Sequence, residues 1–206
     1  MLDGAACLHK HSPPATTKYS DPLTQLYTNI VTMLTTSVLT LALSTMGLAQ
    51  AVVPAGYNKV YLQTMVDTKF VVQAKATTTG STVVVNTVNN KADQHWLLTS
   101  NTSKIYLANS DPPTLCLDAG AKTAWKDMAN VYVNTCSDTA PGQNWTVMAD
   151  GRIAVTGSSP AECLDLQYMR ATANNPVGLY QCAGLNNSGA KDKGINWPQK
   201  NVTTTP

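Results

Sequence analysis

Short apolar runs separated by polar turns make up the chain from residue 57 to residue 197, and no helical spacing of apolar residues is sustained there. The turns contain Gly or Asn, and Asp150-Gly151 is a strong turn signal. Regularly spaced short strands of this kind predict an all-β barrel or sandwich. The expected strands are residues 60–62, 70–72, 83–85, 96–98, 105–107, 116–117, 131–133, 145–147, 153–155, 163–164 and 177–180, followed by the region of Trp197.

This pattern of strands occurs three times. Trp96, Trp145 and Trp197 are separated by 49 and 52 residues, and the segments before them also match. Leu-Cys-Leu-Asp-Ala at residues 115–119 parallels Glu-Cys-Leu-Asp-Leu at residues 162–166. Self-similarity at a nearly fixed period predicts a repeat architecture. We therefore expect three repeats of four strands with pseudo-threefold closure. The repeats cover about residues 57–99, 103–148 and 151–197.

An uncharged, mostly apolar stretch runs over residues 34–48 and is followed by the small-x-small sequence Ala-Gln-Ala at 49–51. It is shorter than the roughly 20 apolar residues that span a bilayer, and it is typical of a secretory signal peptide with its cleavage site. A buried helix over residues 23–48 is the alternative. The predicted parts are a disordered or non-native extension at 1–32, a signal peptide at 33–51 and a secreted domain at 52–206.

Four cysteines follow the predicted signal peptide, and an even number of them in a secreted chain indicates two disulfides. They fall at equivalent places in the second and third repeats, 20 and 19 residues apart. The repeat symmetry selects one of the three possible pairings. The predicted bridges are Cys116–Cys136 and Cys163–Cys182. The first repeat has Val71 and Val88 at these places, and we expect the two valines to fill much the same buried space.

The composition excludes some classes of function. A net charge of +2, with 13% charged residues, is too small for a polybasic nucleic-acid binder. The chain has one glutamate, Glu162, and three histidines, two of which precede the predicted signal peptide. Because an acid–base or zinc enzyme needs several such groups in one pocket, we expect no catalytic residue, no metal and no cofactor. Sequons at Asn101, Asn144, Asn186 and Asn201 fit a secreted glycoprotein.

The tripeptides Gln94-His95-Trp96 and Gln143-Asn144-Trp145, together with Cys-Leu-Asp and a second cysteine about 20 residues later, resemble the motifs of ricin B-type lectins. Residues 150–157, followed by Cys-Leu-Asp-Leu at 163–166, are similar to secreted fungal members in particular. The resemblance covers about residues 57–197 and is weakest in the first repeat. It implies a β-trefoil of twelve strands. The residues that it places in the core are Gln94, Trp96, Gln143, Trp145 and Trp197.

The same resemblance implies a sugar site in each repeat that keeps the right residues. The Asp of Cys-Leu-Asp accepts hydrogen bonds from two sugar hydroxyls, and an aromatic ring two residues before the second cysteine stacks on the sugar. Asp165 and Tyr180 match these places in the third repeat, which is the best candidate. The second repeat keeps Asp118, but Asn134 stands where the ring should be, so Tyr132 is the neighbouring ring that could stack instead.

Other positions depart from the family pattern. The first repeat has Gln73 and Asn86 at the Asp and ring positions, so no sugar binding is expected there. Trp125, a further candidate ring for the second repeat, is expected to be exposed among charged neighbours. The third repeat has a longer approach to its tryptophan, in which the Asn186-Asn187 pair is a candidate source of an amide. Lys191-Asp192-Lys193 is expected to be a solvated loop.

These observations predict a secreted, non-catalytic lectin that recognises galactose-type or related glycans through shallow sites. The expected partners are glycans, with no nucleic acid and no membrane span, and the oligomeric state is left open. A β-trefoil protease inhibitor that acts through surface loops is the alternative, because one fold hosts both functions. A glycosidase needs paired carboxylates across the scissile bond, whereas Glu162 precedes a predicted strand and has no acid partner.

Overall fold

The computed structural model describes residues 55–203, with the exception of residue 102 and residues 110–112. The signal peptide and the extension expected at residues 1–51 lie outside the described residues. The part of the chain that is described holds no helix with the length and apolar character needed to cross a membrane. The strands are β1 (Asn58–Leu62), β2 (Phe70–Ala74), β3 (Ser81–Thr87), β4 (Trp96–Leu98), β5 (Tyr106–Leu107), β6 (Leu115–Asp118), β7 (Tyr132–Thr135), β8 (Trp145–Val147), β9 (Ile153–Val155), β10 (Glu162–Leu166), β11 (Asn175–Gln181) and β12 (Gln199–Asn201). The short 3₁₀ helices are η1 (Ala92–Gln94), η2 (Lys122–Ala124), η3 (Pro141–Gln143), η4 (Gln167–Met169), η5 (Leu185–Asn187) and η6 (Gly189–Lys191).

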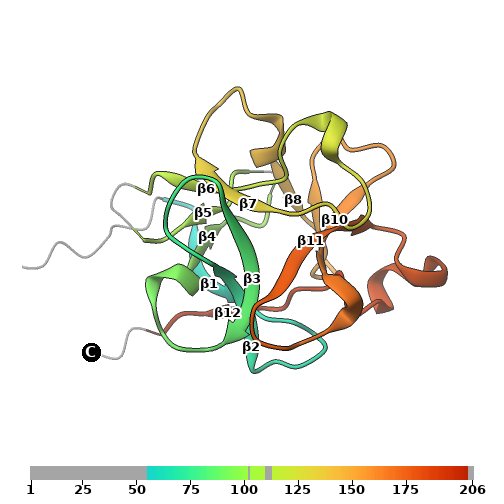
Figure 1. Ribbon diagram of the computed structural model, residues 1–206, viewed down its shortest axis with the longest axis horizontal. Helices are drawn as coiled ribbons and strands as arrows, with labels where there is room; N and C mark the ends of the chain where they lie inside the picture. Colours follow the sequence, from blue (N-terminus) through green and yellow to red (C-terminus); the bar gives the residue numbers. More distant parts are fainter. Residues whose placement is uncertain (1–54, 102, 110–112, 204–206) are drawn as a thin grey trace, which may run out of the picture. The chain divides into compact units, whose positions relative to one another are not determined.

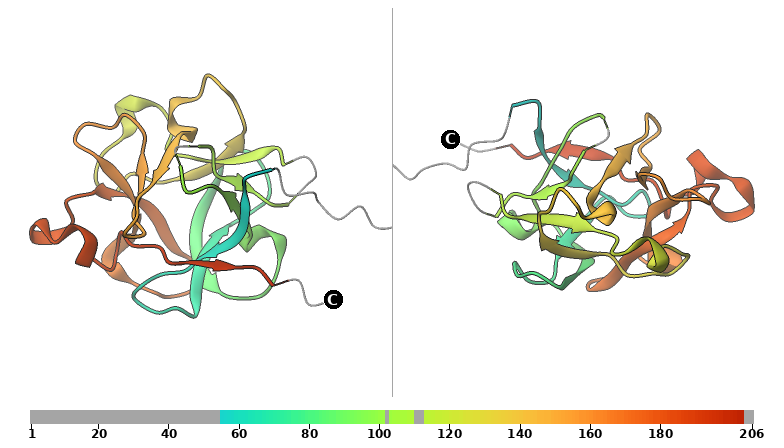
Figure 2. Two further views of the ribbon diagram at one scale, coloured as in Figure 1. Left: turned by 180° about the vertical axis from the view of Figure 1, so that it is seen from behind. Right: turned by 90° about the horizontal axis from the view of Figure 1, so that it is seen from above.

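Two strands from each repeat form a closed barrel (Figure 1). β1 pairs with β4 and β12, β4 pairs with β5, and β8 pairs with β9, all antiparallel. Isolated bridges between Ser103 and Trp145 and between Arg152 and Asn196 join the remaining neighbours and complete the ring. Figure 2 shows β1 and β12 side by side, so the first and last strands of the domain close the barrel together.

The remaining strands form three hairpins that cover one end of the barrel. β2 pairs with β3, β6 with β7, and β10 with β11. β3 also pairs with β7 and with β11, and a bridge between Asn130 and Gly178 links the second hairpin to the third. Each hairpin therefore touches the other two around a shared axis. This arrangement of three four-stranded repeats is a β-trefoil, as the sequence predicts.

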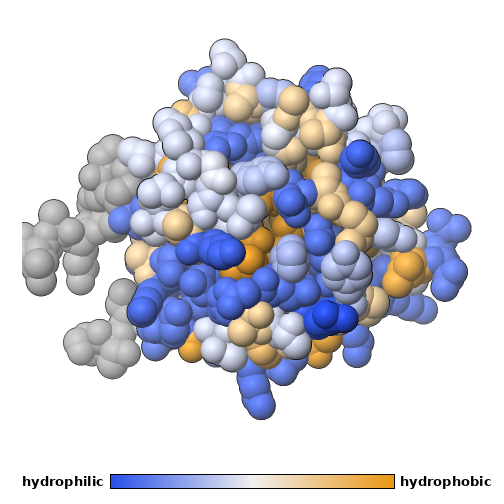
Figure 3. Space-filling view, viewed as in Figure 1, coloured by the Kyte–Doolittle hydropathy of each residue, from blue (hydrophilic) through white to orange (hydrophobic). Residues whose placement is uncertain are grey.

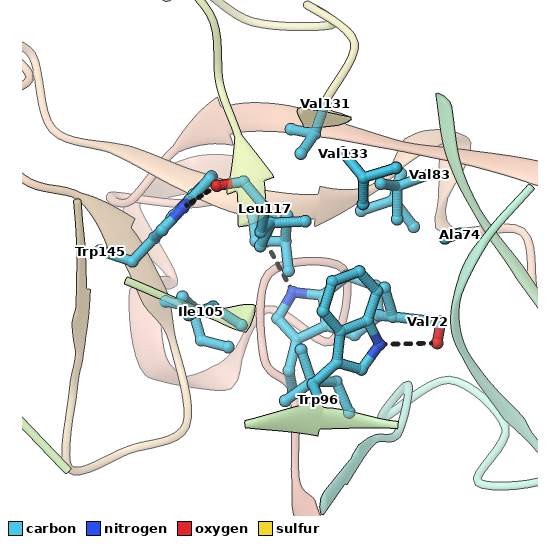
Figure 4. Close-up of a cluster of buried hydrophobic side chains, with 14 of the residues drawn as sticks. Val72, Ala74, Val83, Trp96, Ile105, Leu117, Val131, Val133 and Trp145 are labelled. Atoms are coloured by element: carbon cyan, nitrogen blue, oxygen red, sulfur yellow. Dashed lines mark hydrogen bonds between the residues drawn. The ribbon is translucent and has the colours of Figure 1, made fainter. Parts of the chain in front are cut away.

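The three repeat tryptophans lie in one hydrophobic cluster and are fully buried. A buried indole N–H needs an acceptor, and each ring finds one on the backbone of its own repeat. The bonds run from Nε1 of Trp96 to the carbonyl of Val72 (3.0 Å), from Trp145 to Leu117 (3.0 Å) and from Trp197 to Leu164 (2.8 Å). Figure 4 shows the first two. The tryptophans are thus structural, and the hydrogen bonds that their indole N–H groups donate fix each hairpin to the barrel.

Two disulfides link Cys116 to Cys136 and Cys163 to Cys182, with Cα–Cα distances of 5.1 and 5.0 Å. These are the pairs that the repeat symmetry predicts.

Two expectations about the strands and the first repeat were wrong. Val71 is buried but Val88 is 42% exposed, so the two valines of the first repeat do not replace a buried bridge. The last strand, β12, begins after Trp197 rather than containing it, because the strand is placed by its pairing with β1.

Candidate functional site

A pocket of about 250 Å³ opens on the third repeat, at the Asp and ring positions predicted from the sequence. β10 and β11 supply its walls, and η4 and the segment after residue 182 close two of its sides. Met128, from the second repeat, completes it. The lining residues are Met128, Asp165, Leu166, Tyr168, Met169, Tyr180, Leu185 and Asp192.

Asp165 is the central polar residue of this pocket. Its side chain is only 6% exposed, yet its carboxylate accepts no hydrogen bond from any described residue. Burial raises the pKa of Asp165 to about 7, and the negative charges of Asp192 and Asp127 add to the shift. Buried polar groups nearly always have a partner in a folded protein. The Asp165 oxygens are not among the described buried atoms that lack a partner, so they face the space of the pocket, where the donors of a ligand can reach them.

Tyr180 forms the apolar side of the pocket. It packs against the cluster of Ala154, Cys163, Cys182 and Ile195, and it remains half-buried, with part of the ring on the pocket. In the β10–β11 hairpin Tyr180 lies opposite Cys163, and Gly178 lies opposite Asp165. Because Gly178 has no side chain, Gln167 can lie over it and donate to the carbonyl of Met128 at 3.1 Å. The hairpin thus presents a ring beside a carboxylate.

Asp192 is the pocket residue that the sequence did not identify. The expectation of a solvated loop is confirmed for Lys191 and Lys193, which are exposed. It was wrong for Asp192, which is 6% exposed and accepts the backbone N–H groups of Leu185 (2.7 Å) and Gly194 (2.8 Å). The inserted segment folds into η5 and η6, and this path brings Asp192 back to the pocket. Asn186 and Asn187 are exposed and do not line the pocket, so they do not provide the expected amide there.

The rim of the pocket is unusually apolar for a surface. Four of the six large hydrophobic side chains that are exposed in the described residues line it: Met128, Tyr168, Met169 and Leu185. Tyr168 is the most exposed, at 71%. Figure 3 shows apolar surface among hydrophilic residues on the side of the domain that carries β10, β11 and residues 185–191. Concentration of exposed apolar groups around one hollow indicates a binding surface.

The equivalent residues of the second repeat bond to one another. Asp118 accepts hydrogen bonds from the Gly120 N–H (2.6 Å), from Asn134 Nδ2 (3.0 Å) and from Gln143 Nε2 (3.1 Å). Asn134 in turn accepts the N–H of Gly80 at 2.9 Å. This network leaves the carboxylate without the free acceptors that the third repeat keeps. A Cβ at Gly142 would lie 2.6 Å from Asp118 Oδ1, so the space beside the carboxylate is also filled.

Two further candidates have structural partners. Tyr132 is half-buried and lies opposite Asp118 in the β6–β7 hairpin. The expectation that Trp125 is exposed was wrong, because its half-buried ring packs against the main core and donates from Nε1 to the Gly120 carbonyl at 3.2 Å. In the first repeat, Gln73 donates to Asp93 at 3.1 Å and accepts a bond from Gln94 at 2.9 Å. The third repeat thus combines a pocket with a carboxylate that no described residue bonds, whereas Asp118 of the second repeat is fully bonded.

The repeat geometry agrees with a family comparison. Residues 107–197, which include every residue that lines this pocket, match the ricin-type beta-trefoil lectin domain. The second and third repeats are therefore similar to a ricin-type lectin domain. No curated protein sequence matches the chain.

Solved structures similar to this chain have the same fold at low sequence identity. A mosquitocidal holotoxin is 20% identical with a TM-score of 0.56, over 71% of this chain and 17% of the toxin. The chain therefore spans about a sixth of that relative. The β-trefoil lectin of the Vibrio vulnificus hemolysin/cytolysin, with N-acetyl-D-lactosamine bound, is 14% identical (TM-score 0.53), over 74% of this chain and 100% of that one. The C-half of an earthworm R-type lectin, in complex with GalNAc, is 14% identical (TM-score 0.53), with 70% and 99% covered. These similarities show the β-trefoil fold.

Proposed function

We propose that the protein is a non-catalytic lectin that binds one sugar unit in the third-repeat pocket. The observation that carries this proposal is the buried, unbonded carboxylate of Asp165 in a pocket of about 250 Å³. Sites for drug-sized ligands are typically about 300–1,000 Å³, so this one suits a single sugar ring with its neighbours in solvent.

The chemistry of the pocket matches the two faces of a pyranose. The carboxylate of Asp165 offers acceptors for adjacent hydroxyl groups, and such charge-assisted bonds are stronger than neutral ones. Tyr180 offers a flat ring to the C–H face of the sugar. In the second repeat Asp118 and Asn134 are bonded to each other, so we propose that this repeat, with Tyr132, contributes little to binding. One shallow site gives weak affinity, and useful binding then depends on multivalent display.

The proposed ligands are galactose-type glycans. The support is that the similar Vibrio vulnificus and earthworm lectins hold N-acetyl-D-lactosamine and GalNAc. We also propose that the protein is secreted, with residues 33–51 as a signal peptide, because two disulfides form and persist in oxidising compartments.

A glycan array probed with the full chain tests the lectin proposal. We expect binding to galactose-type glycans that is lost in Asp165→Ala and strongly reduced in Tyr180→Ala, with both variants folded. Asp138→Asn is the matched control, because it removes an acidic side chain that is fully exposed outside the pocket. A folded protein that binds no glycan would contradict the proposal. Hydrolysis of a bound glycan would contradict its non-catalytic part.

The protease-inhibitor alternative gives a different result in a separate assay. An inhibitor that acts through surface loops would block a serine or cysteine protease equally well with and without Asp165→Ala. Such an outcome, together with no glycan binding, would replace the lectin proposal.

A further inference from the structure

The third-repeat pocket contains two neighbouring acidic groups. A Cβ built at Gly194 would lie 3.0 Å from Asp165 Oδ1 and 3.2 Å from Asp192 Oδ1, so the two carboxylates flank the same backbone position. Both side chains are more than nine-tenths buried and both line the pocket. Asp192 is held by two backbone N–H groups, whereas Asp165 accepts no hydrogen bond from the described residues.

The described residues that line the pocket include no basic side chain. The salt bridges found among the described residues, Lys104–Asp138 and Arg152–Asp150, do not involve the pocket, and none of the residues that line it is basic. The nearest lysines in the sequence, at 191 and 193, are exposed and line a neighbouring hollow with Asp192. A third acid, Asp127, acts on Asp165 from the second repeat and is itself bonded to Gln181. Buried charges are normally paired, whereas the lining of this pocket has two acidic side chains, no basic one and no salt bridge among the described residues.

The apolar rim strengthens any charge interaction inside the pocket. Met128, Tyr168 and Met169 surround the acids, and all three have positive φ angles of 66°, 61° and 51°. Such angles are uncommon for residues other than glycine and cost energy. The backbone is therefore strained where it holds apolar side chains around the carboxylates. Bound ligand covered by these side chains would lose water contact, and ionic attraction rises as the local dielectric falls.

We propose that the pocket selects a sugar with a free, protonated amine, such as a 2-amino-2-deoxyhexose, whose ammonium group contacts both Asp165 and Asp192 while the ring stacks on Tyr180. This inference rests on the proposed function and names the substrate class of the same site. An ammonium group has three N–H donors and no acceptor, so it satisfies the unbonded carboxylate and neutralises the excess charge. A hydroxyl group supplies a donor without charge, and an acetamide supplies a single N–H.

Divalent cations fit the pocket less well than an ammonium group. Ca²⁺ takes 6–8 oxygen ligands, and Mg²⁺ requires near-octahedral geometry. Within the described residues, no group of three or more His, Cys, Asp or Glu side chains is placed to hold a metal ion. An ammonium group needs only the two carboxylates and solvent.

Titration calorimetry of the full chain with matched methyl glycosides tests the inference. The ligands are galactosamine, N-acetylgalactosamine and galactose glycosides, together with the same three forms of the gluco series. At about pH 7.5 we expect the free amine to bind at least about tenfold more tightly than either neutral form of its own series. Asp192→Asn should weaken binding of the free amine much more than binding of the neutral sugar, whereas the control Asp138→Asn should change neither.

The pH profile of the unaltered protein gives a second test that does not depend on a variant folding. Affinity for the amino sugar should rise as Asp165 ionises and fall again when the amine loses its proton, whereas affinity for the neutral sugar should rise and stay high. If neutral and N-acetylated sugars bind as tightly as the amine, and still need Asp165, the inference is overturned while the lectin proposal stands. Binding of no sugar at all would overturn both.

Discussion

Replacing Asp165 with Asn should make the protein more stable at neutral and alkaline pH, although it removes the main polar group of the pocket. The folded protein holds the pKa of Asp165 at about 7, against an ordinary value of 3.8. Between these two values the folded state keeps a proton that the unfolded chain has lost. The contribution of Asp165 to stability therefore falls as pH rises through this window and stays low above it.

The size of this effect follows from the pKa difference. A change from 3.8 to about 7 is about 3 pKa units, which corresponds to about 4 kcal/mol in the free energy of unfolding. The pocket opens to water, which screens part of the cost. We therefore expect Asp165→Asn to raise the free energy of unfolding by about 2–3 kcal/mol at about pH 8, and to leave it nearly unchanged at about pH 4.

Urea unfolding at the two pH values measures the difference. The fluorescence of the three core indoles, which become exposed on unfolding, reports the transition. Asp118→Asn is a matched comparison, because Asp118 accepts three hydrogen bonds and its replacement should be destabilising. An Asp165→Asn variant that is less stable than the unaltered protein at about pH 8, or equally shifted at both pH values, would refute the electrostatic reasoning.

Three further predictions concern the fold. Trp145→Phe should lower the free energy of unfolding by about 2–3 kcal/mol in urea, because it leaves a buried carbonyl without its donor. Replacing Cys116 and Cys136 with Ser should cost about 3 kcal/mol, measured by thermal unfolding, since the bridge closes a loop of 20 residues. Gly142→Ala should lower the melting temperature markedly, because a Cβ there would overlap the Gly120 carbonyl oxygen; an unchanged melting temperature would contradict this packing.

The trefoil could be predicted because its main determinants repeat in the sequence. Trp96, Trp145 and Trp197 recur at a nearly constant period, and each makes the same bond to its own hairpin. The cysteines recur in the same way, and their pairing follows. The prediction from repeat symmetry was wrong where the sequence of one repeat had diverged from the others. Val88 takes a cysteine position, but without a covalent bond nothing holds it inside, and it is exposed.

The candidate site was predicted only in part. Asp165 and Tyr180 occupy family positions, so their meeting in one pocket could be expected. Asp192 could not be found by spacing, because it belongs to an insertion with no counterpart in the other repeats. Its charged neighbours in the sequence suggested solvent, whereas two backbone N–H groups and the turns of η5 and η6 bury it. Trp125 was misplaced for a similar reason, since its neighbours are polar but its ring reaches the core.

The pairing of β1 with β12 has a consequence for biogenesis. Val60 lies opposite Asn201, so the barrel needs partners that are synthesised at opposite ends of the domain. Contacts between residues so distant in sequence form late and slowly. The ring cannot close until nearly the whole domain has left the ribosome, and a nascent chain must keep its β1 edge unpaired until then.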